Sequence, residues 1–412
     1  MIYLHVPFCR SFCTYCGFFS VISSSEPAFE EAIEAEIDAR RDEIAAAAAV
    51  NTLYIGGGTP SVLPLDVLSR IVTAIGWSPG RGVAAGPVAA RGHMNGWTAE
   101  GGTGRSAERG GSGATAPSGD LRVTGEFTIE VNPEDIVEKG EEYVRGLMAL
   151  GVNRISMGVQ SFDDGILKWM NRRHDSSRAV EAFGILRRCG IRNISIDLIF
   201  GLPQLDDATW KATIEKALEL APEHISAYQL SVDEGSALAE LLSAGKFTEA
   251  DETQCRRQYD VLCERLGAAG YHHYEISNFA LPGYEAVHNS AYWRRVPYVG
   301  LGPGAHSLSA DGVRSWNSQE IPRRLRDGNL ATYSREEEVL TPEDIRIERI
   351  MLPLRTDEGI PEEELRSLAG DDPIDRLLSE GALVRLVSPS NHRVRIPEDR
   401  FFVSDEIIRE LI

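Results

Sequence analysis

Three cysteines stand close together near the start of the chain. Cys9, Cys13 and Cys16 occur in HVPFCRSFCTYCGFF, residues 5–19, with the spacing C-x3-C-x2-C. Thiols at such short spacing bind metals or carry out redox chemistry. The other three cysteines are far away in the sequence, so this group has no fourth thiol beside it.

Four interpretations of the three thiols compete. Structural zinc takes four protein ligands, and His5 is the nearby residue that could complete such a set, although it is expected to point away along its strand. A disulfide would leave one thiol unpaired and is rare in a reducing compartment, and three unrelated thiols are the third option. The fourth is a [4Fe–4S] cluster on three thiolates, which leaves one iron open to an exogenous ligand. Open metal positions are typical of catalytic sites.

Other candidate site residues stand at the ends of predicted strands. Residues 56–60 read GGGTP, and glycine lets a ligand come close to the backbone. Polar groups also occur in EVNP (130–133), GVQS (158–161) and DLIFGLP (197–203). Ligands bind at the carboxyl ends of parallel strands in both barrels and open sheets. One such group alone would usually be structural, but together they predict a site on this edge.

Apolar, β-branched runs alternate with amphipathic stretches and so predict the elements that position these residues. The strands are expected at 2–7, 52–55, 127–131, 154–159, 194–200 and 224–230. The helices between them are expected at 30–49, 65–75, 141–150, 177–189 and 208–220. Near-continuous apolar strands indicate parallel strands covered on both faces. The pattern predicts an α/β fold of six βα units, as an open sheet or as a curved partial barrel.

The rest of the chain divides into three further parts. Residues 76–125 are rich in glycine, alanine, serine and arginine and are expected to be a disordered insertion within the first domain, 1–232. An accessory region is expected over 233–335, with helices near 236–244 and 249–269. Residues 336–412 predict a small winged-helix-like domain with helices at 343–352, 361–368 and 374–379, followed by a hairpin formed by 383–397 and 400–403.

Composition excludes several classes of protein. The formal net charge of −20 argues against a nucleic-acid binder, which would need a basic surface. No apolar run reaches the length of about 18 residues that a membrane span requires, and no secretory signal is visible. Six cysteines in 412 residues are too few for a disulfide framework. We therefore expect a protein of the reducing cytoplasm.

The cysteine spacing directly after a first strand resembles that of the radical S-adenosylmethionine (SAM) superfamily. The resemblance implies that Cys9, Cys13 and Cys16 hold a [4Fe–4S] cluster, that SAM chelates the fourth iron, and that SAM cleavage gives a 5′-deoxyadenosyl radical. It also implies a partial six-stranded (β/α) barrel. GGGTP then resembles the superfamily's glycine motif, which binds the SAM amino group.

Further motifs make the resemblance more specific. YLHVPFC, GGGTP, IEVNP, SMGVQSF, NRRH and IDLIFGLP resemble the oxygen-independent coproporphyrinogen III oxidase-like group of radical SAM proteins. This resemblance implies SAM contacts at Tyr3, Tyr15, Gly57, Gly58, Thr59, Glu130, Gln160, Arg172 and Asp197. Glu130 or Asp197 would accept hydrogen bonds from the ribose or the amine, and Arg172 would pair with the carboxylate. The ring of Tyr15 would pack against adenine.

That group contains an oxidase, which decarboxylates coproporphyrinogen III, and a branch of haem chaperones. The oxidase motif continues to a further cysteine where this sequence has Phe18, and the oxidase has a longer arm before its cysteines. HNSAYW, residues 288–293, resembles the H-N-x-x-Y-W motif of the chaperone branch. The resemblance therefore favours a haem chaperone, with the oxidase as the alternative and a purely structural cluster protein disfavoured.

The implied cargo is haem, delivered to respiratory haem proteins through transient contact, which could take place at the membrane surface. His288 is the candidate axial ligand, because imidazole commonly binds haem iron, and the alternative is that it only shapes a loop. The remaining cysteines and three other histidines are expected to be structural: Cys189, Cys255, Cys263, His272, His273 and His306. The sequence does not specify an oligomeric state.

Overall fold

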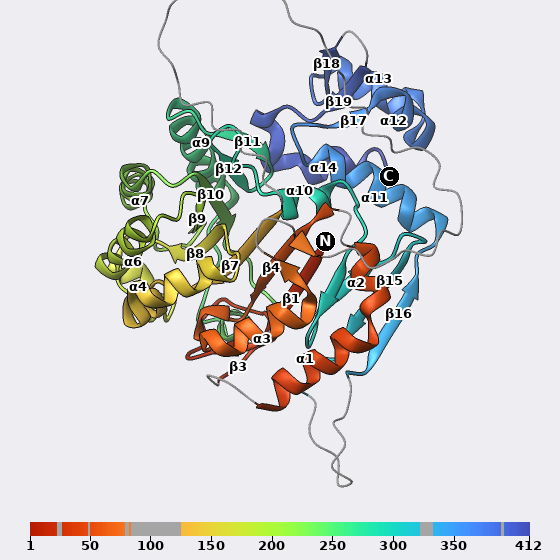
Figure 1. Cartoon of the computed structure of the whole chain (residues 1–412). Coiled ribbons are helices and arrows are strands. Elements are labelled where there is room, and N and C mark those ends of the chain that lie inside the picture. The colour runs from red at the N-terminus through yellow and green to blue at the C-terminus, as the bar shows by residue number, and fades with distance from the viewer. Residues whose placement is uncertain (23–26, 48–49, 79–81, 84–124, 322–332, 389–390) are drawn as a thin grey trace, which may run out of the picture.

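The computed structural model describes residues 1–22, 27–47, 50–78, 82–83, 125–321, 333–388 and 391–412 (Figure 1). Its centre is a nine-stranded sheet in the order β11-β12-β10-β9-β8-β7-β4-β1-β13. Six neighbouring strands are parallel: β1 (Ile2–Val6), β4 (Thr52–Gly57), β7 (Glu126–Val131), β8 (Arg154–Gln160), β9 (Ile194–Phe200) and β10 (His224–Gln229). All six were predicted from the sequence.

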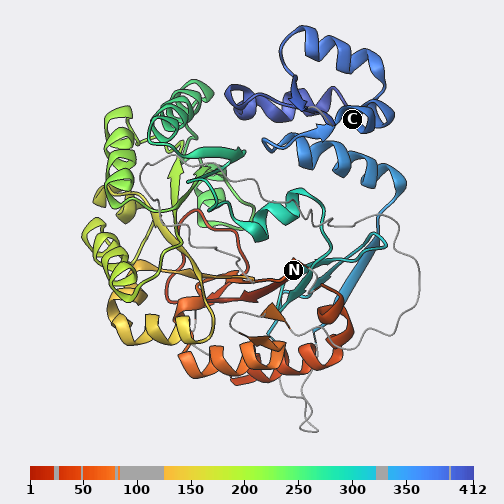
Figure 2. The same ribbon diagram turned by 45° about the horizontal axis from the view of Figure 1, so that its top comes forward.

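Helices cover the outer face of this curved sheet (Figure 2). They are α1 (Pro27–Ala39), α2 (Arg41–Ala47), α3 (Leu65–Ile75), α4 (Pro133–Ala149), α5 (Asp164–Trp169), α6 (Ser176–Cys189) and α7 (Asp207–Leu220). Asn132, Asp163, Asp175 and Asp206 each cap the helix that follows, by accepting a hydrogen bond from a backbone N–H of its first turn. The α/β partial barrel predicted from the sequence is therefore confirmed.

Each barrel strand is buried except at one or two positions. In β7 the partly exposed residue is Glu130, in β8 it is Gly158, and in β9 it is Asp197. The flanking apolar side chains belong to one continuous core between the sheet and the outer helices. Because side chains alternate across a strand, the exceptions face the inside of the barrel, where a ligand can reach them.

The region after the barrel extends the sheet at both ends. At one end, β12 (Asn278–Ala280) pairs antiparallel with β10 and with β11 (His272–Glu275). At the other end, β13 (Val299–Leu301) pairs parallel with β1. The remaining elements are α8 (Ala237–Ser243), α9 (Glu252–Ala268), α10 (Val287–Trp293), and a three-stranded sheet of β14 (His306–Leu308), β15 (Val313–Asn317) and β16 (Arg335–Val339).

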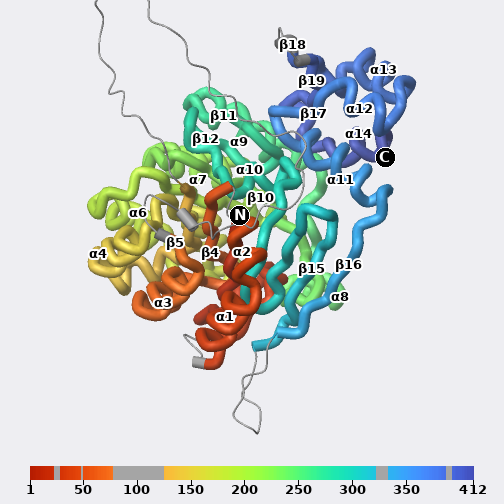
Figure 3. Tube along the Cα trace, turned by 45° about the vertical axis from the view of Figure 1, so that its right-hand side comes forward, coloured from red at the N-terminus to blue at the C-terminus, as the bar shows by residue number. Residues whose placement is uncertain are grey.

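A small module ends the chain (Figure 3). Its elements are α11 (Pro342–Leu354), β17 (Ile360–Pro361), α12 (Glu362–Ala369), α13 (Asp371–Ser379), β18 (Val384–Ser388), β19 (Asn391–Arg395), the 3-10 helix η3 (Glu398–Val403) and α14 (Ser404–Arg409). The strands form an antiparallel sheet in the order β17-β19-β18. Ile276 N–H donates to Arg355 O and Asp357 N–H to Tyr274 O, which joins the module to β11.

Several predicted boundaries are wrong. The helix expected at 30–49 is divided at Arg40, whose buried guanidinium donates to Gly300 O at 2.6 Å and to Ser307 Oγ at 2.9 Å. The helix expected at 141–150 begins at Pro133, because Asn132 already caps it. Residues 400–403 belong to η3 and not to a strand. The first error arises from contacts with a distant part of the chain, and the second arises from capping geometry.

The predicted insertion at 76–125 lies mostly outside the described residues. Within its described part, β5 (Trp77–Ser78) and β6 (Gly82–Val83) form an antiparallel pair. Two more short strands, β2 (Phe8–Cys9) and β3 (Val21–Ile22), flank the cysteine loop and pair in parallel. Among the described helices, none combines the length and the apolar composition needed to cross a bilayer.

Candidate functional site

A cavity of about 460 Å³ is lined by the cysteine loop, the glycine segment 57–59 and the inner residues of β7 to β10. Of the residues singled out from the sequence, it is bordered by Cys9, Cys13, Cys16, Tyr15, Gly57, Gly58, Thr59, Glu130, Gln160, Arg172 and Asp197. The barrel thus brings together groups that lie up to 188 positions apart, from Cys9 to Asp197.

Backbone hydrogen bonds fix the cysteine loop over the carboxyl ends of the strands. Gly58 N–H donates to Val6 O and Thr59 N–H to Phe8 O, both at 2.8 Å. Cys9 Sγ lies 3.5 Å from Thr59 Oγ1. A Cβ on Gly58 would lie 2.8 Å from Phe8 O and 3.1 Å from Cys9 Sγ, so this position accepts only glycine without a shift of the loop.

The three thiols suit an iron–sulfur cluster. Burial raises the pKa of the Cys9 thiol and raises that of Cys16 to about 11. Iron binding would have to displace these protons, which couples metal affinity to pH. Among the described residues, no three His, Cys, Asp or Glu side chains converge on a single metal ion, and no further cysteine borders the cavity. Thiolates are the ligands that iron–sulfur clusters use, so the donor set fits.

Of the three carboxyl groups that border the cavity, Glu130 and Asp197 belong to the barrel strands and Asp233 follows them. Glu130 accepts hydrogen bonds from Tyr54 OH at 2.7 Å and from Gly57 N–H at 3.1 Å. Burial raises its pKa to about 7, against the opposing effect of the Tyr54 hydrogen bond. Burial likewise raises the pKa of Asp197 to about 6, opposed by a hydrogen bond from Ser226. Both groups can therefore accept hydrogen bonds from a cationic or hydroxyl-bearing ligand near neutral pH.

Arg172 connects the cysteine loop to β8. Its guanidinium donates to Cys13 Sγ at 3.3 Å and to Gly158 O at 2.7 Å. Gln160, at the end of β8, has a positive φ of 68°, which is a strained conformation for a residue with a side chain. Such strain is typical of functional sites, because the surrounding structure has to hold it.

Three sequence candidates lie elsewhere. Tyr3 and His5 are described residues that do not border the cavity: Tyr3 OH contacts His5 Nδ1 at 3.1 Å, and His5 Nε2 contacts Phe19 O at 3.0 Å. His288, on α10, is only 1% exposed. Its Nδ1 lies 2.8 Å from Thr52 Oγ1 and its Nε2 lies 3.0 Å from Tyr292 OH. Burial lowers its pKa to about 3, so the ring is neutral.

Comparison with known proteins decides the family. Residues 3–217, just over half of the chain, match the family model described as the radical SAM superfamily. The chain belongs to the radical SAM superfamily. The resemblance predicted from the cysteine spacing and the glycine segment is therefore confirmed.

The curated relatives of this radical SAM protein include several with the name heme chaperone HemW. The protein of that name from Lactococcus lactis is 32% identical, over 87% of this chain and 82% of its own length. The one from Bacillus subtilis is 31% identical, over 87% of this chain and 84% of its own. The chain therefore belongs to the same family as these proteins.

Among solved structures, the coproporphyrinogen III oxidase HemN from Escherichia coli has a similar fold. The TM-score is 0.67 and the identity is 18%, over 100% of this chain and 89% of the oxidase. This likeness of fold includes the region after the barrel, because it covers the whole chain.

The radical SAM cavity includes residues that sequence motifs alone did not reveal. These are mainly Tyr54, Arg154, Ser156, Ser226 and Tyr228 of the barrel strands, and Asn289 of α10. Arg154 is 2% exposed and its Nε has no hydrogen-bond partner among the described residues. The alternation of side chains along each strand could have predicted Tyr54 and Ser156. Both pair across neighbouring strands with residues that also face the inside of the barrel.

A second cavity, of about 720 Å³, lies between the region after the barrel and the C-terminal module. His272, with 42% of its side chain exposed, and Trp293 of the HNxxYW motif border it. Arg294 pairs there with Glu358, and Arg349 pairs with Glu364. Helix α10 thus contributes Asn289 to the first cavity and Trp293 to the second.

Proposed function

We propose that this radical SAM protein is a haem chaperone that binds haem and passes it to respiratory haem proteins. The observation that carries the proposal is the 31–32% identity to proteins named heme chaperone HemW over 87% of the chain. Two sequence features support the same branch: Phe18 in place of a further cysteine, and the HNSAYW motif at 288–293.

The same proposal assigns the first cavity to a [4Fe–4S] cluster and SAM. Cys9, Cys13 and Cys16 would hold the cluster, which when bound supplies an electron and an open coordination position. The carboxylates of Glu130 and Asp197 would accept hydrogen bonds from the SAM amine and ribose, and Arg172 would pair with its carboxylate. Tyr3, predicted as a contact, is better explained as support for His5, to which it is hydrogen bonded.

Haem ligation by His288 stays a prediction, and the geometry supports another role for this ring. Both of its nitrogens are within hydrogen-bond distance of a hydroxyl group, and the backbone N–H groups of Val287 and His288 donate to Glu126. These contacts hold α10 against the start of β4 and β7. His272, which borders the second cavity together with Trp293, has an exposed imidazole whose Nε2 lies 2.9 Å from Asp357 Oδ2.

Haem titration followed by absorbance tests the function. We expect saturation at about one haem per chain, because one exposed imidazole borders one large cavity. His288→Ala and His272→Ala identify the ligand, with the exposed His306→Ala as the control. His288→Ala should also lower the free energy of unfolding by about 1–3 kcal/mol, because two buried hydroxyl groups lose a partner.

Two outcomes would change the assignment. A loss of haem binding in His288→Ala at full stability would make His288 the ligand, and no binding of haem by the unmodified protein would end the chaperone proposal. Formation of protoporphyrinogen IX from coproporphyrinogen III, in anaerobic incubation with SAM and a reductant, would replace it by the oxidase activity.

A further inference from the structure

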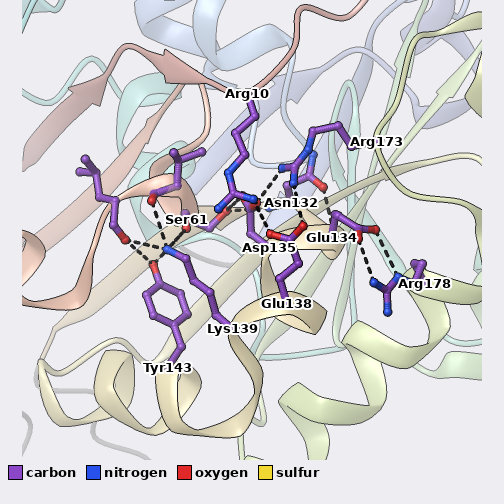
Figure 4. A network of polar contacts seen from close by, with 12 residues as sticks. Arg10, Ser61, Asn132, Glu134, Asp135, Glu138, Lys139, Tyr143, Arg173 and Arg178 are labelled. Atoms are coloured by element: carbon purple, nitrogen blue, oxygen red, sulfur yellow. Dashed lines mark hydrogen bonds and ion pairs between the residues drawn. The ribbon is translucent and has the colours of Figure 1, made fainter. Parts of the chain in front are cut away.

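A polar network on the outer side of the first cavity joins segments that carry site residues (Figure 4). Arg10 follows Cys9, and Arg173 follows Arg172. Both arginines reach Glu138, and both approach Asp135 of α4, Arg173 Nη1 at 2.7 Å and Arg10 Nη1 at 3.8 Å. The cysteine loop and the loop of Arg172 therefore meet at one helix.

Asp135 is the centre of this network. Its side chain has no exposed surface, and in addition to the two arginines it accepts a hydrogen bond from Ser61 Oγ at 2.8 Å. A buried carboxylate is costly unless cations and hydrogen bonds compensate it, so all of these partners are held in place by one another. Asp135 itself is a described residue that does not border the cavity.

Ser61 extends the network to two more segments. It follows the glycine segment by two residues, and its Oγ accepts a hydrogen bond from Asn132 N–H at 3.0 Å, at the end of the strand that carries Glu130. Lys139 Nζ donates to the carbonyl oxygens of Ser61, Val62 and Leu63 at 2.6–3.1 Å. The short helix after the glycine segment is thus tied to α4 at several points.

We propose that Asp135 is a positioning residue, which sets the relative placement of the cysteine loop, the glycine segment and Arg172 so that cluster and SAM fit together. This inference rests on the cofactor assignment proposed above. The cysteine loop and the loop of Arg172 contact Asp135 directly, through Arg10 and Arg173. The glycine segment and the end of β7 are connected to it through Ser61. Each contacting residue is within two positions of a residue that borders the cavity. A substitution of Asp135 is therefore expected to displace several of the segments that border the cavity.

Glu134 provides the matched control. It lies in the same first turn of α4, but its carboxylate pairs with Arg178 of α6, at 2.9 Å, and forms no ion pair or hydrogen bond with the described residues of the cysteine loop, the glycine segment or the loop of Arg172 (Figure 4). Asp135→Asn and Glu134→Gln each remove one carboxylate charge while keeping the size of the side chain. The two variants differ in whether the lost charge held the site segments together, and Asp135 is also the more deeply buried of the two.

The first measurement is SAM binding by reconstituted protein, followed by the change that SAM causes in the electron paramagnetic resonance spectrum. We expect Asp135→Asn to weaken SAM binding by about tenfold to a hundredfold, the range found when groups that orient metal ligands are removed. Iron content per chain should stay near that of the unmodified protein, because the three thiols remain. Glu134→Gln should bind SAM as the unmodified protein does.

The second measurement needs no cofactor. Hydrogen exchange of the empty protein should be faster in Asp135→Asn over residues 8–20, 57–63 and 170–174, and unchanged elsewhere in the barrel. Normal SAM affinity together with normal exchange in Asp135→Asn would overturn the inference. If that variant does not fold, the SAM affinity and hydrogen exchange of Ser61→Ala and Arg173→Gln are measured instead, with the same expected and contradicting results. If the unmodified protein binds no cluster or SAM, the cofactor assignment fails, and exchange in the loops alone decides the role of Asp135.

Discussion

At the residue scale, the cavity depends on a few groups whose chemistry is changed by burial. Glu130 and Asp197 lie inside the barrel, and burial raises their pKa values to about 7 and about 6. Neither carboxyl forms an ion pair with an arginine or lysine of the described residues, although the charge of Arg154 partly opposes the rise of both pKa values. A ligand with a positive charge can therefore supply the missing partner.

Glu130 predicts how SAM affinity depends on pH. Its carboxyl should be mostly ionised at about pH 8 and mostly protonated at about pH 6, so SAM should bind more weakly as the pH falls through 7. Glu130→Gln should weaken binding at about pH 8 by about tenfold to a hundredfold, the loss expected for a hydrogen bond to a charged group. Titration calorimetry at several pH values checks this. An equal dependence on pH in the variant and the unmodified protein would contradict it.

At the element scale, the turn after β4 determines how close the cysteine loop can come. Gly57 has φ of 110°, a conformation that favours glycine, and a Cβ there would lie 2.7 Å from the His5 ring. The φ of Gly58 lies outside the positive range that favours glycine, but its neighbours leave no room for a methyl group. The two glycines thus meet different requirements within the same turn.

Gly58→Ala should therefore reduce cluster assembly, because its methyl group would push on Phe8 O and on Cys9 Sγ. We expect iron content after reconstitution to fall by at least about half, with the fold retained. Gly267→Ala in α9 is the control, since nothing lies within 4 Å of its added Cβ and alanine favours the helix. Iron analysis and circular dichroism measure the two effects. Full iron content in Gly58→Ala would contradict the prediction, because it would show that the cysteine loop can move to accommodate the methyl group.

At the scale of the whole molecule, the barrel and the C-terminal module meet at a polar junction. Glu275 of β11 forms a bridge with Thr356 and is only 1% exposed. Burial raises its pKa to about 7, although the nearby polar groups of Ser277, Asn278 and Trp293 oppose the rise. The HNxxYW motif thus also contributes to the contact between the two parts.

Glu275 predicts a loss of stability with rising pH. Its native pKa is above the value of 4.5 expected in the unfolded chain, so its contribution is complete below that pH and is lost as the pH rises through about 7. The decrease is about 3 kcal/mol for this shift. Glu275→Gln should make the measured decrease smaller by about this amount, and the exposed control Glu264→Gln should leave it unchanged. Urea unfolding at about pH 5 and about pH 8 measures it, and the same decrease in Glu275→Gln would refute the prediction.

The sequence by itself determined the family, the six barrel strands and eleven of the residues that border the cavity. This was possible because the evidence is local: three thiols at fixed spacing, glycines after a strand, and buried apolar runs that alternate with amphipathic helices. Each of these patterns lies within a short stretch of chain, and their combination favoured one interpretation where a single pattern left several open. Cys9, Gly58 and Glu130 could be chosen for that reason.

The tertiary structure alone decided where contacts between distant segments form. It placed Tyr3 beside His5 instead of in the cavity, enclosed His288 between Thr52 and Tyr292, and brought Asp135 to the centre of a network. No spacing in the sequence encodes these pairs, because each joins elements whose proximity is set by the packing of the whole barrel. A residue type and its neighbours in sequence predict what chemistry a side chain can do, and the fold decides which partners it has.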